Sequence, residues 1–242
     1  MKWTFKSDLL VFCFLSIICT SSIYCQVELF NNQMDLLQQT YVKNGSVDYL
    51  GIKNDKELVL LIKSSFYDVN LEQLSDIQQI SFYINAYNFW VIDKTLEYYP
   101  TNSVMEITGF FETPNIPWND RLYSLNEFEQ ELFIKFPNEP RLHFVLVCAA
   151  KGCPDLSNRA FTLDNYKTKI KYRTQIALQD EKMVQLDMHE KKAYVSKIFK
   201  WYRSDFTKEL PLRGYLNKYL DKKIPEGFSI HFQDYDWDLN DL

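Results

Sequence analysis

One short stretch of the sequence brings together the residue types that most often carry nucleophilic chemistry. His143 lies in an apolar run of strand-forming residues, Cys148 ends that run, and Cys153 follows five positions later. No other segment places a histidine and two cysteines so close together. A cysteine nucleophile needs a base within hydrogen-bond reach and a third group that orients the base. This stretch is therefore where we expect any chemistry.

The spacing leaves two arrangements open. The run from Arg141 to Cys148 predicts a β-strand, in which alternating side chains point His143 and Cys148 to opposite faces. Gly152 then predicts a turn, because glycine adopts backbone conformations that other residues avoid. That turn can return Cys153 to Cys148, which gives a disulfide, or to His143, which gives an activated thiol.

The activated thiol corresponds to a cysteine-dependent hydrolase or acyl transferase. The candidate catalytic residues are Cys153 as nucleophile, His143 as base, and Glu129, Asn85 or Asn88 as the orienting group. A helix packed on an antiparallel sheet is compatible with a papain-like or transglutaminase-like arrangement, by fold analogy only. Such enzymes usually carry the thiol at the start of the central helix. Here that helix contains asparagines and no cysteine, which argues against the enzyme.

The N-terminus has the three regions of a secretory signal peptide. Lys2 and Lys6 make its start positive, residues 9–18 are almost entirely apolar, and small residues follow at 20–22. A membrane-spanning helix needs about 20 apolar residues, and this apolar run is shorter. We expect a signal peptide over residues 1–25 and export to the periplasm or the medium.

Two other uses of the N-terminus are less favoured. An acylated lipoprotein cysteine, Cys19 or Cys25, would follow the bulky Ile18 or Tyr24, where a small residue is expected. An uncleaved anchor is the second alternative. Because no further apolar run of spanning length occurs, we expect residues 26–242 to form a single globular domain without a membrane span.

Removal of the signal peptide leaves Cys148 and Cys153 as the remaining pair. An even pair in an exported chain favours a disulfide. A zinc site built from these cysteines and His143 is a weaker hypothesis, because only three ligands are at hand and a strand points His143 away from Cys148. We therefore expect neither a metal nor a cofactor.

Composition excludes several functional classes. The 242 residues carry a net charge of −5 with acids and bases interspersed, so no basic stripe indicates nucleic-acid binding. The 6 glycines include no phosphate-binding loop, and 3 histidines are too few for a histidine-rich metal site. Aromatic residues make up 16% of the chain, which is enough for a substantial core and an aromatic binding surface.

The longest predicted helix runs from about Ser75 to Tyr98. Ser75 and Gln78 form a capping box, and apolar residues on most of the circumference predict a buried central helix. Asn85 and Asn88 lie on one face, and buried amides must be hydrogen-bonded. They either hold a neighbouring loop, which is the structural alternative, or orient a catalytic group.

A second capping box, Ser124 and Glu127, opens a helix that carries Glu129, which either approaches the His143 segment or stays solvated. Apolar periodicity predicts further helices near 34–42, 55–66, 166–178 and 212–220, and strands near 183–186, 193–199 and 228–235. Helices lead and strands cluster late. The predicted class is α+β, with a central buried helix and further helices packed on an antiparallel sheet.

Several motifs together resemble the domain of unknown function 547 family. They are Phe82–Asn88, Ser124–Glu129, His143–Pro154, Ser196–Phe206 and Tyr235–Asn240. The resemblance implies a domain that occurs alone in bacteria and fused to other modules in plants and animals, with no settled activity. The family often has histidine where this chain has Gln130, which argues against an indispensable role for that position.

These observations favour a non-catalytic binding module for a peptide, a glycan or a small molecule. The cysteine-dependent hydrolase or acyl transferase that uses Cys153 and His143 is the alternative. The state of Cys153 distinguishes the two, because a disulfide leaves no nucleophile and a free thiol beside an imidazolium is reactive.

Overall fold

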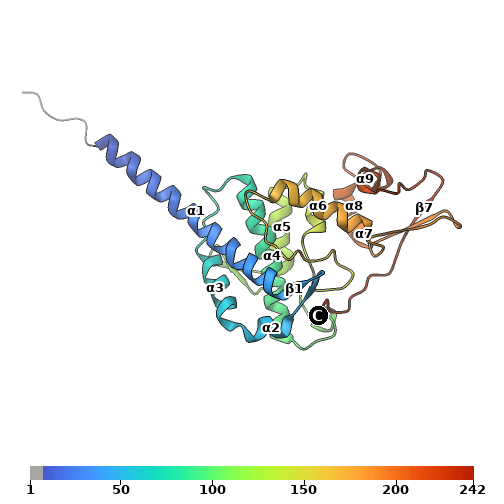
Figure 1. The fold of residues 1–242 in the computed structure, drawn as a ribbon, viewed down its shortest axis with the longest axis horizontal. Coiled ribbons are helices and arrows are strands. Elements are labelled where there is room, and N and C mark those ends of the chain that lie inside the picture. The colour runs from blue at the N-terminus through green and yellow to red at the C-terminus, as the bar shows by residue number, and fades with distance from the viewer. Residues whose placement is uncertain (1–7) are drawn as a thin grey trace, which may run out of the picture.

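The computed structural model describes the backbone of residues 8–242 and the side chains of residues 25–242. Its helices are α1 (Asp8–Tyr41), α2 (Tyr49–Asn54), α3 (Lys56–Tyr67), α4 (Asp76–Tyr98), α5 (Leu125–Lys135), α6 (Tyr166–Gln179), α7 (Ile198–Trp201), α8 (Arg203–Phe206), α9 (Leu212–Tyr219) and the 3-10 helices η1 (Val104–Glu106) and η2 (Pro140–Phe144). Its strands are β1 (Val42–Lys43), β2 (Ser46–Val47), β3 (Ile116–Trp118), β4 (Arg121–Tyr123), β5 (Val184–Asp187), β6 (Lys192–Val195) and β7 (Ser229–Phe232). The class is α+β, as predicted (Figure 1).

Helix α4 is the buried centre of the larger part of the molecule. Ser75 caps it, and the predicted capping box with Gln78 is present. The helix is buried without interruption from Gln78 to Thr95, and Ile84 is fully enclosed. Helices α1, α2 and α5 pack around it. The absence of a polar face is thus explained, because every side of α4 meets protein.

An aromatic cluster joins α4 to its neighbours. Phe66 of α3 stacks on Phe82 of α4 at a centroid distance of 5.6 Å. The ring centroid of Trp118, in β3, lies 4.8 Å from that of Phe66 and 5.3 Å from that of Phe82. Strand β3, which forms a hairpin with β4, therefore inserts an aromatic anchor into the core.

A second, smaller core lies around the three-stranded sheet. Strand β5 pairs with β6 in the antiparallel sense, as predicted, whereas β7 pairs with β6 in the parallel sense. The sheet is therefore mixed. Its apolar side packs with α6, α9 and Phe144, while α4 belongs to the other core. The prediction that the central helix packs on the sheet is thus wrong, because the two elements bury separate apolar surfaces.

The predicted strand over residues 141–148 is also wrong. Pro140 begins η2, and the chain then continues without a strand partner. The apolar run is buried on both sides, with Leu142, Val145 and Val147 in the larger core and Phe144 in the smaller one. An apolar run of this length indicates burial, and it does not by itself select a strand.

A C-terminal segment, residues 235–240, lies beside the cysteine-containing turn. The backbone N–H groups of Lys151 and Gly152 donate to the carbonyl groups of Asp238 and Asp236, both at 2.8 Å. Asn240 donates back to the carbonyl group of Ala149. This pairing places aromatic residues from the segment next to the two cysteines.

Helix α1 is longer than the helix predicted near residues 34–42. Its first part projects from the rest of the molecule (Figure 1), whereas Val27, Phe30, Met34 and Leu37 are buried in the larger core. Among residues 8–242, no helix combines the length and the apolar character that a membrane span requires. The predicted signal peptide, residues 1–25, lies outside the described side chains apart from Cys25, and stays a prediction.

Candidate functional site

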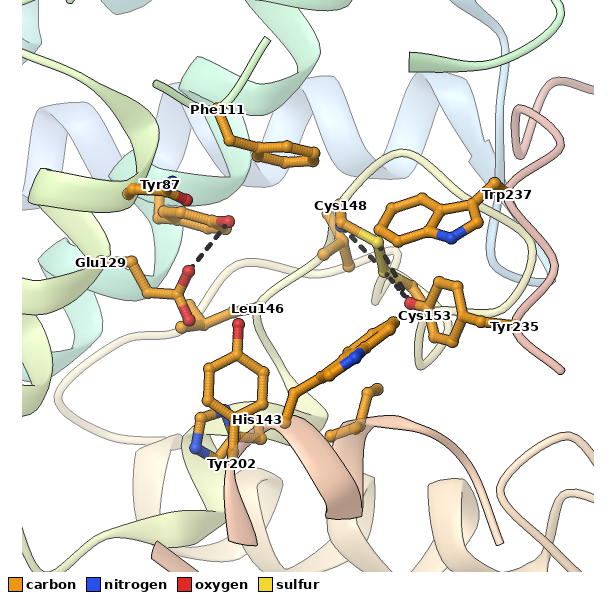
Figure 2. Close-up of a pocket in the computed structure, with 14 residues that line it drawn as sticks. Tyr87, Phe111, Glu129, His143, Leu146, Cys148, Cys153, Tyr202, Tyr235 and Trp237 are labelled. Atoms are coloured by element: carbon orange, nitrogen blue, oxygen red, sulfur yellow. Dashed lines mark hydrogen bonds between the residues drawn. A yellow bond between two sulfur atoms is a disulfide. The ribbon is translucent and has the colours of Figure 1, made fainter. Parts of the chain in front are cut away.

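Side chains from helix α4, at Tyr87, to the C-terminal segment, at Trp237, meet at a cavity of about 200 Å³. Its aromatic lining consists of Tyr87, Phe111, Trp201, Tyr202, Tyr235 and Trp237. Glu129 and Tyr87 lie on one side of the opening, and the cysteines with Tyr235 and Trp237 lie on the opposite side (Figure 2). The cavity is therefore mostly apolar, with a few convergent polar groups, as ligand sites usually are.

Cys148 and Cys153 form a disulfide with a Cα–Cα distance of 6.3 Å, as the sequence predicted. The Tyr235 hydroxyl group lies 3.0 Å from Sγ of Cys153 and 3.2 Å from Sγ of Cys148. Both cysteines line the cavity, so the bridge forms part of its wall (Figure 2). While the bridge persists, neither sulfur is a nucleophile.

The turn between the cysteines differs in detail from the predicted one. Ala149, and not Gly152, has a left-handed backbone, with φ of 59°. Gly152 is needed for a different reason. A Cβ atom there would lie 2.8 Å from the backbone oxygen of Asp236 and 3.0 Å from the ring of Tyr235. The missing side chain therefore allows the C-terminal segment to approach.

His143 is buried between two aromatic rings. Its ring centroid lies 4.4 Å from that of Phe133 and 4.0 Å from that of Tyr202. Nε2 is 2.9 Å from Oδ2 of Asp205. Burial lowers the pKa of His143, and the hydrogen bond to Asp205 opposes this change. We assign the neutral ring at pH 7, with Nε2–H donating to the carboxylate, so this nitrogen is not available as a base.

Glu129 supplies the acid of the cavity. Its side chain is partly exposed, but its carboxyl group is enclosed by protein, and this burial raises its pKa to about 7. Hydrogen bonds from Tyr202 and from Tyr87, whose oxygen lies 3.4 Å away, oppose the increase. The negative charge of Asp205 adds to it. Near neutral pH the carboxyl group is therefore close to half ionised.

The two asparagines hold loops and do not line the cavity. Asn85 bonds both backbone groups of Phe161 and the side chain of Asn31. Asn88 donates to the carbonyl group of Val145 and accepts from the N–H group of Val147. Both thus hydrogen-bond other segments, as predicted, and neither hydrogen-bonds residues 149–156. Their geometry therefore favours the first of the two roles considered from the sequence, in which the asparagines hold neighbouring loops and do not orient a catalytic group.

A family model described as "Protein of unknown function, DUF547" matches residues 71–175. The chain contains a DUF547 domain. No curated protein and no solved structure matches the chain. The matched region includes Tyr87, Glu129, His143 and both cysteines of the cavity. The remaining wall, with Trp201 to Trp237, lies beyond the matched residues of the DUF547 domain.

The structure brings only some of the predicted site residues together. Glu129, His143, Cys148 and Cys153 line the same cavity of the DUF547 domain and its C-terminal extension. Sequence reasoning missed Asp205, and it did not place Tyr87, Tyr202 or the residues of the C-terminal segment in a site. The only signal in the sequence was the presence of Trp201, Tyr202, Tyr235 and Trp237 within motifs that resemble the family.

The cavity has no set of metal ligands within the described part of the chain. No group of three histidine, cysteine, aspartate or glutamate side chains there is arranged to hold a metal ion. The zinc hypothesis required two thiolates, and both sulfur atoms are joined in the disulfide. The DUF547 domain in this state therefore does not offer the proposed zinc ligands.

Proposed function

We propose that this chain is a non-catalytic module that binds peptides, and that its cavity receives one side chain of the ligand. The aromatic cavity of about 200 Å³ carries the proposal. Cavities that enclose an entire small ligand usually measure about 300–1,000 Å³. A smaller cavity lined by six aromatic rings suits one group that projects from a longer chain.

A neighbouring groove supports an extended ligand. Its apolar lining comes from Phe133, Ile134 and Pro137, and Ile134 is 75% exposed. The groove and the cavity share Glu129 and Tyr202. The groove and the cavity therefore adjoin, which suits a peptide that lies along the groove and places one side chain in the cavity. A glycan would leave most of its hydroxyl groups against this apolar lining, which favours a peptide.

The cysteine-dependent hydrolase or acyl transferase is the second candidate. It is favoured by one observation, namely that His143, Glu129 and Cys153 line a single cavity. One other opposes it, because Cys153 is bridged to Cys148. The hydrogen bond between Nε2 of His143 and Asp205 does not count against an enzyme, because such a bond orients the ring and leaves Nδ1 as the remaining nitrogen. This function requires reduction of the disulfide before any thiolate forms.

Export remains part of the proposal. It rests on the signal-peptide pattern of residues 1–25, and a disulfide is typical of an oxidising compartment. Cleavage between residues 20 and 26 would keep Val27, the first described side chain that is fully buried. N-terminal sequencing of exported material tests this, and full-length protein retained in membranes would contradict it.

Selection from a phage-displayed library of random peptides tests the binding function. Trp201 lines the cavity and is 47% exposed, so Trp201→Ala removes a wall with little cost to folding. Tyr172→Ala is the matched control, because Tyr172 is 59% exposed on α6, outside the cavity. We expect peptides that bind the wild-type and Tyr172→Ala proteins and lose affinity for Trp201→Ala. Equal binding to all three proteins, or enrichment of no peptide, would reject the proposal.

A further inference from the structure

We infer that the cavity selects a cationic side chain, with an ammonium group of the lysine type placed between the Glu129 carboxylate and the aromatic rings. The inference rests on the proposed binding function and specifies the chemistry of the group that enters.

Glu129 is an enclosed acid without a basic partner among the described residues. Two other enclosed carboxylates have one: Asp93 lies 2.8 Å from Nζ of Lys63, and Asp35 lies 2.9 Å from Nε of Arg159. Glu129 has only phenol donors, from Tyr87 and Tyr202. A buried carboxylate is usually paired, so a cation from outside would complete this site.

The charges around the cavity have a single sign. No lysine or arginine is among the described residues that line the cavity or the adjoining groove. His143 of η2 is neutral at pH 7. Asp205 of α8, which bonds Nε2 of His143, adds a second negative charge to that of Glu129. Lys208, which lies 4.0 Å from Oδ1 of Asp205, has a side chain that is 43% exposed and does not line the cavity. The field in the cavity therefore favours a cation.

Tyr235 and Trp237 lie on the side of the opening opposite Glu129 (Figure 2). Ring centroids there are close together: Tyr235 lies 4.7 Å from Trp237 and 5.0 Å from Trp201. Faces of tryptophan and tyrosine attract ammonium groups through their quadrupoles, most strongly where water is excluded. The methylene groups of a lysine would also contact Leu146 and Ile198, which line the same cavity.

A neutral side chain would not satisfy the same site. It would leave the ionised Glu129 carboxylate with its two phenol donors but without a positive charge, which penalises ligands that lack a charge. Binding of a cation is in turn coupled to ionisation of Glu129. Because the pKa of this carboxyl group is about 7 in the empty cavity, affinity for a cation should increase with pH between 5.5 and 8.

Three probes test the inference by NMR titration at pH 8. They are Nα-acetyl-lysine methylamide, its Nε-trimethyl derivative and the neutral isostere Nα-acetyl-norleucine methylamide. We expect at least one cationic probe to bind about tenfold more tightly than norleucine, and about tenfold less tightly at pH 5.5 than at pH 8. Signals of Trp201 and Trp237 should shift on binding.

Variants assign the preference to one carboxyl group. Glu129→Gln should abolish the difference between cationic and neutral probes, whereas Glu131→Gln, the same change on the same helix outside the cavity, should preserve it. Tighter binding of norleucine, no binding of any probe, or an unchanged preference in Glu129→Gln would each overturn the inference. The peptide selection above reports separately on the binding function, since peptides with neutral anchors would support that function and reject this inference.

Discussion

The Oδ1 atom of Asn88 accepts a hydrogen bond of 3.0 Å from the backbone N–H group of Val147, one residue before Cys148. Its Nδ2 atom donates to the carbonyl group of Val145 at 2.9 Å. Asn88→Ala leaves both buried backbone groups unpaired, so the free energy of unfolding should decrease by about 2–4 kcal/mol. Urea denaturation followed by tryptophan fluorescence measures this change.

Asn85→Ala provides the control for this prediction. Asn85 is equally buried on the same helix, but it holds Phe161, away from the cavity. Both variants should lose stability, whereas only Asn88→Ala should also weaken binding of peptides selected on the wild-type protein. Equal binding losses in the two variants would show that Asn88 has no specific role in positioning the cavity wall.

Glu129→Gln should be more stable than the wild-type protein at alkaline pH. The folded carboxyl group has a pKa of about 7, against the ordinary value of 4.5, so the folded state holds its proton more tightly than the unfolded state. The free energy of unfolding therefore decreases as pH increases through this window. We expect near equality at pH 4.5 and a difference on the order of 2 kcal/mol at pH 8. Thermal unfolding across this range measures it, and a difference that is independent of pH would contradict it.

Asp205→Asn should lower the pKa of His143 further. Burial already lowers this pKa from 6.5, and Asp205 opposes that effect through its hydrogen bond and its charge. The unfolded state therefore binds a proton at His143 more readily than the folded state does. In the wild-type protein, the free energy of unfolding should decrease as pH falls below about 6.5. NMR titration of the imidazole signals measures the change. The exposed His189 and His231 provide reference signals, which the substitution should leave unchanged.

Thiol labelling followed by mass spectrometry should distinguish the cysteines. In the full chain Cys25 is exposed and free, so it should react without reductant, whereas Cys148 and Cys153 should react only after reduction. Reduction should lower the free energy of unfolding by about 2 kcal/mol, because the bridge closes a short loop. Labelling of Cys153 without reductant, at a rate that depends on His143, would instead support the enzyme.

Local sequence signals predicted α3, α4, α5, α6 and α9 and their starts, but they missed α2, and α7 begins inside the predicted strand 193–199. Ser75 and Ser124 each form the capping box that their spacing indicated, because a cap depends on residues within one turn. The segment 141–148 could not be predicted in the same way. Two of its backbone groups, the carbonyl of Val145 and the N–H of Val147, bond the side chain of Asn88, 57 and 59 residues earlier, and not a neighbouring strand. Composition alone cannot reveal such a partner.

The candidate site was only partly predictable for the same reason. The pairing of Cys148 with Cys153 follows from a short spacing, whereas the partner of His143 lies 62 positions later in the chain. Glu129 could be named from the sequence, but its raised pKa depends on enclosure by Tyr87 and Tyr202. Those contacts are tertiary, and no local pattern encodes them.

The C-terminal segment has a consequence for the order of folding. Asn240 accepts a hydrogen bond from the hydroxyl group of Tyr49, across a separation of 191 residues, and Val47 donates to its backbone carbonyl group. Contacts between residues so far apart in the sequence form slowly, because the long intervening loop must first be closed. The helical core around α4 should therefore become structured first. The wall that carries Tyr235 and Trp237 should dock afterwards, so the cavity would be among the last features of the native state to form.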